Sequence, residues 1–419
     1  MTESIDNHIS SNNPRCINIP NFFYIGNGMI DDLEHILNKE GIKIDGALII
    51  SGNGYTAEIA DSIAARMSHV RRLRISSNDI DAIQGIEKAI EDNDTHLVIA
   101  VGGGKVIDTV KYACSRLSKP VLVIPTTLSN DGISSPVSVV SIVNVDSIGV
   151  RPPIGIVIDI GIVKKAPKHT ILAGIGDLIS NISAVEDWRL AHEYTGLQID
   201  RFAEIVSRNA AERFIYYVLK SGRTSSSSRF SKEILQDHKD KEQMHIKIID
   251  NERYRMSSND IKDGTYEYSN CIDDSDVNCT DINDTKFLIC LAEGLIQSGI
   301  AMSIAGSSRP ASGAEHLISH ALDTILDKPK PHGIQVGFAT LFTQALRGSD
   351  ITDIMEVYRS LGFPTTFDAI GISIDTFMEA IRVAPYTRKN RFTILDTVDE
   401  SRVKYALMLA YGISDMNVT

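Results

Sequence analysis

The chain has 419 residues, of which 43% are hydrophobic and 23% are charged, a composition typical of a globular protein with a substantial core and two or three domains. Its net charge of −12 argues against a nucleic-acid-binding protein, because such proteins usually present a basic face. Residues 1–20 show no signal-peptide pattern, no apolar run reaches the ~18 residues of a membrane span, and the five scattered cysteines indicate a reducing compartment, so we expect a cytoplasmic protein.

Residues 21–167 predict alternating strands and helices. After a polar tail at 1–20 and a short edge strand at 22–26, apolar strands alternate with helices of ten or more residues. We expect strands at 46–51, 70–75, 97–101 and 121–125, helices at 29–38, 55–66, 80–91 and 106–117, and a β-hairpin with a returning strand within 134–160. This alternation is typical of βαβ units. The prediction is an α/β, Rossmann-like domain with a parallel, doubly wound sheet.

Residues 168–419 are predicted to form an all-α domain, with the domain boundary near 165–170. Helical periodicity dominates 172–219 and 284–415. Between them, 221–283 is rich in Ser, Asp, Lys and Asn and includes a run of four serines. We interpret it as a polar surface insertion, partly disordered, with a possible short strand or solvated helix. A lid or a docking segment is the alternative.

A glycine-rich turn is the first motif with chemical meaning. In LVIAVGGGKVIDTVK, a buried strand runs through Gly102, Gly103 and Gly104 directly into a helix. Glycines there allow backbone N–H groups and the helix N-terminus to approach a phosphate. Asp108, expected in the first turn, either faces a bound nucleotide or complements the helix dipole. Because the motif is not GxGxxG, it indicates either a phosphate loop or a tight turn.

A polar loop follows the next parallel strand, in IPTTLSNDGISSP. Loops at the carboxyl ends of such strands form the ligand crevice of doubly wound sheets. The candidate side chains are Thr126, Thr127, Ser129, Asn130 and Asp131. The alternative is a polar β-turn in which Asn, Asp and Gly serve only the turn.

Three of the eleven histidines lie within a short stretch. His316 and His320 are four apart in a predicted helix, so they share one face and could converge on a divalent metal. His332 follows Pro331, where we expect the helix to have stopped and the chain to turn. The alternative is a polar helix face that is rich in histidine.

The segment AGIGDLISN provides a carboxylate. Here Gly174 and Gly176 are predicted to flank a tight turn, after which Asp177 opens a helix. Asp177 is then either an N-cap or a group that leans over the crevice between the two domains.

Together, GGGKVID, PTTLSNDGISSP, GIGDLISN, SGIAMSIAGSSRPASGAEHLISHALD and KPHGIQVG resemble the glycerol-1-phosphate dehydrogenases. These belong to the superfamily of iron-containing alcohol dehydrogenases, glycerol dehydrogenases and dehydroquinate synthases. The resemblance covers about 20–220 and 284–400 and implies a dehydroquinate synthase-like fold; the insertion departs from the family pattern. We also expect a homo-oligomer.

The resemblance implies a role for each motif. Asp177, His316 and His332 match the ligands of a divalent metal, most often zinc, and His320 matches a substrate-facing residue that can be a fourth ligand in the iron alcohol dehydrogenases. The matches to the cofactor site are Gly102, Gly103, Gly104, Lys105 and Asp108 for the pyrophosphate, and Thr126, Thr127 and Ser129 for the nicotinamide ribose. Asp131 matches a position near the nicotinamide and the substrate hydroxyls. Arg309 either binds the substrate phosphate or braces the helix start.

The implied activity is a metal-dependent NAD(P)H oxidoreductase of phospholipid biosynthesis that reduces dihydroxyacetone phosphate to sn-glycerol 1-phosphate. The metal would polarise the carbonyl as hydride arrives at C2, with His320 or Asp131 relaying the proton. The predicted strand at 46–51 ends at Ser51 without a carboxylate that could bind the ribose 2′-hydroxyl of NAD, which leaves NADPH possible beside NADH. Three alternatives are a sugar-phosphate cyclase of the dehydroquinate synthase type, a dehydrogenase of a related polyol or phosphorylated substrate, and a non-catalytic binding module.

Overall fold

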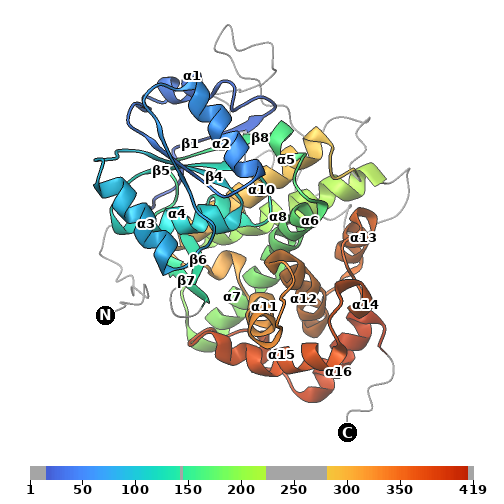
Figure 1. Cartoon of the computed structure of the whole chain (residues 1–419). Coiled ribbons are helices and arrows are strands. Elements are labelled where there is room, and N and C mark those ends of the chain that lie inside the picture. Colours follow the sequence, from blue (N-terminus) through green and yellow to red (C-terminus); the bar gives the residue numbers. More distant parts are fainter. Residues whose placement is uncertain (1–15, 142–144, 223–280, 414–419) are drawn as a thin grey trace.

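The computed structural model describes residues 16–141, 145–222 and 281–413. Most of the polar tail and nearly all of the predicted insertion, with its possible strand and helix, lie outside the described residues. Figure 1 shows a parallel sheet with its helices in the upper half and an all-helical half below it. The predicted fold class is confirmed.

Six strands form one parallel sheet. They are β1 (Phe22–Gly26), β2 (Leu48–Ser51), β3 (Arg71–Arg74), β4 (Val98–Gly102), β5 (Val121–Pro125) and β8 (Gly155–Asp159), in the order β1-β8-β5-β4-β2-β3. The predicted edge strand is therefore confirmed as β1. The predicted hairpin is also confirmed, as the antiparallel pair β6 (Val137–Ser141) and β7 (Val145–Gly149).

Helices cover both faces of the sheet. They are α1 (Leu33–Lys39), α2 (Tyr55–Arg66), α3 (Ile80–Glu91), α4 (Gly104–Arg116) and the short α5 (Ile160–Val163). Apolar residues of α1 and α2 pack on one face, and those of α3 and α4 on the other. Every residue of β4, β5 and β8 is buried, which explains why these strands read as continuous apolar runs. The predicted helix at 29–38 begins later, at Leu33, because Gly28 turns the chain with φ of 73°.

The described residues after β8 are helical. The α-helices are α6 (Lys168–Ile179), α7 (Asn181–Thr195), α8 (Arg201–Gly222), α10 (Thr285–Ala305), α11 (Ala314–Ile325), α12 (His332–Arg347), α13 (Thr352–Leu361), α14 (Phe367–Ile370), α15 (Ile374–Thr387) and α16 (Glu400–Tyr411). Short 3-10 turns are η1 (Asp131–Ile133), η2 (Arg309–Ala311) and η3 (Ile394–Asp396). The packing pairs that matter for the site are α6 with α12, and α11 with both α12 and α15.

Helix α10 is a core helix. Within the described ranges it is the one helix long and apolar enough to cross a membrane, but 83% of its apolar window is buried inside the fold. It packs along α8 and contacts η1 and η2. Its Asp284 N-cap accepts hydrogen bonds from two backbone N–H groups, which stabilises the start of this helix.

Candidate active site

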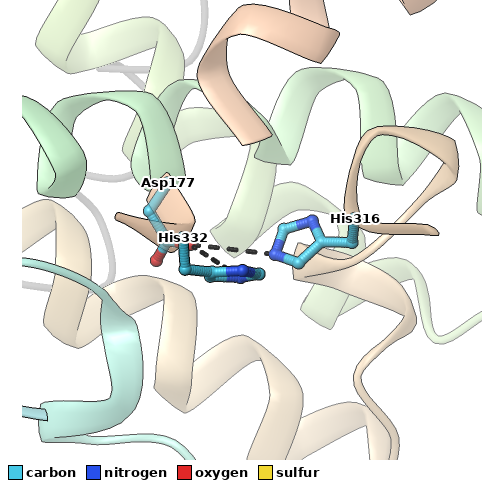
Figure 2. Close-up of side chains that lie close together, drawn as sticks. All are labelled: Asp177, His316 and His332. Atoms are coloured by element: carbon cyan, nitrogen blue, oxygen red, sulfur yellow. Dashed lines mark ion pairs between the residues drawn. The ribbon is translucent and has the colours of Figure 1, made fainter. Parts of the chain in front are cut away.

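Asp177, His316 and His332 converge on one point. One ligand atom from each lies within 4.8 Å of the other two. Asp177 Oδ1 is 3.7 Å from His316 Nε2 and 4.0 Å from His332 Nε2, and Figure 2 shows both rings directed at the carboxylate. Asp177 and His316 are buried, while the His332 side chain is one-third exposed. One carboxylate oxygen and two imidazole nitrogens fit a catalytic divalent metal, since this donor set leaves further coordination positions open.

Asp177 does not open a helix, so the N-cap interpretation is wrong. It lies in the last turn of α6, whose N-cap is Pro167. The flanking glycines serve close packing and not a turn. A Cβ on Gly174 would lie 2.0 Å from Leu128 O, and one on Gly176 would lie 2.1 Å from Gly333 O.

The glycines bring α6 and α12 into backbone contact. A Cβ on Gly333 would lie 1.9 Å from Ala173 O, and one on Gly337 would lie 2.6 Å from Gly176 Cα. His332 is the first residue of α12, with Pro331 as N-cap, so the chain at His332 enters a helix and does not merely turn as predicted. Because the two backbones touch at these glycines, Asp177 and His332 face each other across the contact.

His316 and His332 each have the ring nitrogen that faces away from Asp177 in contact with a neighbouring side chain. His316 Nδ1 donates to Glu315 Oε1 at 2.9 Å, and the same oxygen accepts from Gly313 N at 2.6 Å. His332 Nδ1 lies 3.1 Å from Ser319 Oγ. Such partners fix the tautomer and orientation of a metal-binding ring. Sequence reasoning missed Glu315 and Ser319, although both lie within the EHLISH motif.

Asp131 lies beside Asp177. Its backbone N–H donates to Asp177 Oδ2 at 2.9 Å, which leaves Asp177 Oδ1 directed at the histidines. The Asp131 carboxylate accepts from Ser298 Oγ at 2.8 Å. Burial, reinforced by the negative charge of Asp177, raises the pKa of Asp131 to about 7. Ser298, on α10, carried no signal in the sequence beyond its polarity.

The three histidines differ in protonation. Burial lowers the pKa of His316, but hydrogen bonds with Asp177 and Glu315 outweigh it and raise the pKa to about 9. Burial and the charge of His316 lower the pKa of His332 to about 4. Burial, together with the charges of His332 and His316, lowers the pKa of His320 to about 3. A cation bound here would displace the proton from His316, since imidazole binds metals in its neutral form.

His320 is near the cluster but is not one of its members. Its ring stacks on that of His332 with centroids 5.8 Å apart. The predicted helical pair of His316 and His320 does lie on α11. The convergent pair, however, is His316 with His332, whose ring centroids are 5.1 Å apart.

The glycine turn lies where β4 meets α4. Gly102 ends β4, Gly103 is the N-cap, and Gly104 is the first helical residue. The first N–H groups of a helix have no intrahelical acceptor, so they are available to an anion. Gly102 also packs tightly, because a Cβ there would lie 2.7 Å from Val106 Cβ. Lys105 is exposed at this helix start.

The polar loop after β5 folds over this turn. Thr126 N donates to Gly102 O at 3.0 Å, and the Thr127 methyl lies 3.2 Å from where a Cβ on Gly103 would be. Thr127 Oγ1 also donates to Thr170 Oγ1 on α6 at 2.6 Å. Ser129 is half-buried in the same loop. The loop therefore connects the glycine turn to the helix that carries Asp177.

Asp108 lies deeper than expected. Because α4 begins at Gly104, Asp108 is in the second turn and not the first. Its buried carboxylate is 3.4 Å from Lys111 Nζ, which donates to the carbonyl oxygens of Gly132, Ser135 and Val137. This buried pair braces the loop that carries Asp131, and contact between Asp108 and a nucleotide stays a prediction.

Arg309 is buried, and its guanidinium donates to Phe392 O at 2.7 Å and Asn390 O at 3.3 Å. These bonds brace the segment after α15. Two further arginines of that segment, Arg388 and Arg391, lie beside Arg309. They were not predicted as site residues, because no motif around them in the chain indicates a site.

Comparison with known proteins identifies relatives over nearly the whole chain. A family model described as iron-containing alcohol dehydrogenase matches residues 24–167. The chain is 32% identical to glycerol-1-phosphate dehydrogenase [NAD(P)+] of Pyrococcus furiosus, covering 90% of this chain and 92% of that protein. It is 30% identical to the enzyme of the same name from Methanococcoides burtonii, covering 93% and 94%.

Solved structures share the fold. A probable glycerol dehydrogenase from Sinorhizobium meliloti superposes with a TM-score of 0.63 at 19% identity, covering 94% of this chain and 97% of that one. Maleylacetate reductase from Rhizobium sp. superposes with a TM-score of 0.61 at 14% identity, covering 95% and 98%. The resemblance read from the motifs is confirmed: the chain belongs to the glycerol-1-phosphate dehydrogenase family, within the iron-containing alcohol dehydrogenases.

Proposed function

We propose that the chain is a metal-dependent NAD(P)H oxidoreductase that reduces dihydroxyacetone phosphate to sn-glycerol 1-phosphate. The observation that carries the proposal is the convergence of Asp177, His316 and His332 in a chain so similar to enzymes named glycerol-1-phosphate dehydrogenase [NAD(P)+]. The name of these relatives supports either nicotinamide cofactor. The donor set supports a divalent metal, and we propose Zn²⁺ because two imidazoles and one carboxylate suit it.

A divalent ion held by these ligands would supply a Lewis acid that polarises the substrate carbonyl. The chain's own residues do the rest of the positioning. Glu315 and Ser319 hold the two imidazole rings, and the Asp131 N–H holds the Asp177 carboxylate. With its pKa near 3, His320 is neutral at physiological pH, so it can hydrogen-bond a substrate hydroxyl as donor or acceptor. Asp131, with a pKa near 7, is suited to pass a proton.

The cofactor would span the crevice above the carboxyl ends of β4 and β5. The proposed pyrophosphate contacts are Gly102, Gly103, Gly104, Lys105 and Asp108, and the proposed ribose contacts are Thr126, Thr127 and Ser129. The start of α4 and the loop folded over it support this placement. We also propose a dinucleotide-binding domain at 21–167 and a metal- and substrate-binding domain at 168–419, a cytoplasmic location and a homo-oligomer.

The test is to follow reduced-cofactor absorbance with dihydroxyacetone phosphate, using NADH and NADPH in parallel. Activity should disappear with a chelator and return with Zn²⁺. The product should resist a dehydrogenase specific for sn-glycerol 3-phosphate. Absence of cofactor oxidation with every triose phosphate would contradict the proposal. Release of inorganic phosphate from a sugar phosphate without net cofactor oxidation would instead indicate the cyclase alternative.

A further inference from the structure

Arg388 and Arg391 meet at the start of α11, the helix that carries His316 and His320. Both guanidinium groups donate to Ser308 Oγ, Arg388 from 3.0 Å and Arg391 from 3.2 Å. Arg391 also donates to Ser312 O, just before α11 begins at Ala314. Arg388 directly follows α15, which packs along α11. Two arginines of the segment after α15 thus meet at Ser308, which lies 80 residues before Arg388 in the chain.

The cluster concentrates buried positive charge. Arg391 is 8% exposed, and its Nε is buried without a hydrogen-bond partner. Burial, and then the charges of Arg388 and Arg309, lower the pKa of Arg391 well below its usual range. Buried like charges are costly unless an anion compensates them.

The carboxylates whose charges act on Arg391, those of Glu315 and Asp187, are already engaged. Glu315 holds His316. Asp187 forms an ion pair with Arg347 and accepts from two backbone N–H groups. Both carboxylates are therefore held by other groups, and neither is a dedicated partner of Arg391.

The cluster also adjoins the candidate active site. Ser312, whose carbonyl oxygen accepts from Arg391, lies four residues before His316, and α11 carries both His316 and His320. His320 in turn stacks on His332, one of the proposed metal ligands.

We propose that Arg388 and Arg391 bind the phosphate monoester of the substrate, while Arg309, bonded to the backbone at 390 and 392, holds the segment in place. The planar guanidinium fork matches phosphate oxygens. In dihydroxyacetone phosphate the ester oxygen is attached to the carbon next to the carbonyl, so its phosphate lies close to the point where the carbonyl binds. The inference rests on the proposed function for the identity of the substrate. Arg388 and Arg391 were not among the site residues predicted from the sequence.

The kinetic test compares Arg388→Met and Arg391→Met with wild type, using dihydroxyacetone phosphate and dihydroxyacetone. Loss of one charge-assisted contact should raise KM for the phosphorylated substrate about 10- to 100-fold. Because dihydroxyacetone has no phosphate, its kinetics should not change. Arg388→Lys should retain part of the affinity. Arg382→Met, an exposed position on α15, is the matched control and should leave both KM values unchanged.

A binding test separates this inference from the proposed function. Inorganic phosphate is titrated into the zinc-loaded full chain by calorimetry, with circular dichroism to confirm folding. Wild type should bind phosphate and Arg388→Met should not. If the wild type binds phosphate through Arg388 but does not reduce dihydroxyacetone phosphate, only the proposed function fails. If the wild type does not bind phosphate, or if Arg388→Met changes neither phosphate binding nor KM, the inference is overturned. If Arg391→Met does not fold, the test rests on Arg388→Met, because Arg388 is only half-buried.

Discussion

Glu315 directly precedes a proposed metal ligand in the sequence and also supports it in the fold. Its fully buried carboxylate accepts the Nδ1–H of His316, which turns Nε2 toward Asp177. Because the same oxygen also accepts from Gly313 N, the start of α11 and the ring are fixed together. A negative charge behind the imidazole also makes its free nitrogen a stronger donor to a cation.

We expect Glu315→Gln to lower metal affinity about 10- to 100-fold, as changes to such supporting groups do. The amide keeps an oxygen acceptor of the same shape but loses the charge. Zinc competition with a chromogenic chelator measures the effect. Glu379→Gln, at an exposed position on α15, is the control and should leave affinity unchanged. Equal affinities for wild type and Glu315→Gln would show that the charge has no role.

For the ligand itself, His332→Ala should abolish stoichiometric metal binding and activity while leaving the fold intact. Its side chain is one-third exposed at the first position of α12, so truncation leaves little buried cavity. Metal content by mass spectrometry and far-UV circular dichroism check the two parts. His35→Ala, exposed on α1, should retain both metal and activity. Full activity in His332→Ala would refute the metal assignment.

At the scale of elements, the contact between α6 and α12 sets the relative positions of two proposed ligands, Asp177 and His332. It is built from Gly176, Gly333 and Gly337, and a Cβ at any of them would overlap backbone or ring atoms. Of these three, only Gly176 was given a role from the sequence, that of flanking a tight turn, since a glycine is used both for turns and for close approach. The atoms that each glycine meets belong to segments far away in the chain, and local periodicity carries no information about them.

Gly333→Ala should lower the free energy of unfolding by at least about 1–3 kcal/mol, because its methyl group would overlap Ala173 O and force the helices apart. Metal affinity should fall with it. Gly85→Ala on α3 has nothing within 4 Å of its added Cβ and should stabilise by about 0.5–1 kcal/mol, the usual gain in a helix interior. Urea unfolding with and without zinc measures both variants.

The buried Lys111 links α4 to the loop that carries Asp131. Lys111→Met would leave the Asp108 carboxylate buried beside an apolar group, which should cost about 3–5 kcal/mol of stability. The double variant Lys111→Met/Asp108→Asn removes both charges and should recover part of this loss. Equal destabilisation in the single and double variants, by urea unfolding, would argue against charge pairing as the main contribution.

At the scale of the whole molecule, periodicity predicted the strands and helices of 21–167, including the bounds of α3 and β5, and the helical character of the second half but not its individual helices. This was possible because the spacing of apolar residues within each element reflects which of its faces is buried. The proposed metal ligands became identifiable only through the family motifs, since α6, α11 and α12 each contribute one and the spacing between them follows no local rule. Arg388 and Arg391 had neither signal, because the Ser308 hydroxyl that both of them contact lies in a distant segment of the chain.

Because the proposed ligands come from three helices, a bound metal should stabilise the molecule as a whole. A ligand that binds only the folded state adds about 2.7 kcal/mol when present at 100 times its dissociation constant. We therefore expect a chelator to lower the Tm of the wild type measurably and to leave that of His332→Ala unchanged. Scanning calorimetry at matched protein concentration gives the comparison. A similar chelator effect on both proteins would mean that the ion binds elsewhere.

Because of the glycine contact between α6 and α12, the position of a proposed metal ligand does not depend on which side chain supplies the donor atom. Main-chain atoms set the spacing of residues 177 and 332, so a different side chain at either position would start from the same Cα. This part of the fold should therefore tolerate exchange of donor atoms, with Asp177→His or Asp177→Glu shifting the preferred ion while the helices keep their places. Within such a family, the choice of metal could diverge faster than the backbone that holds it.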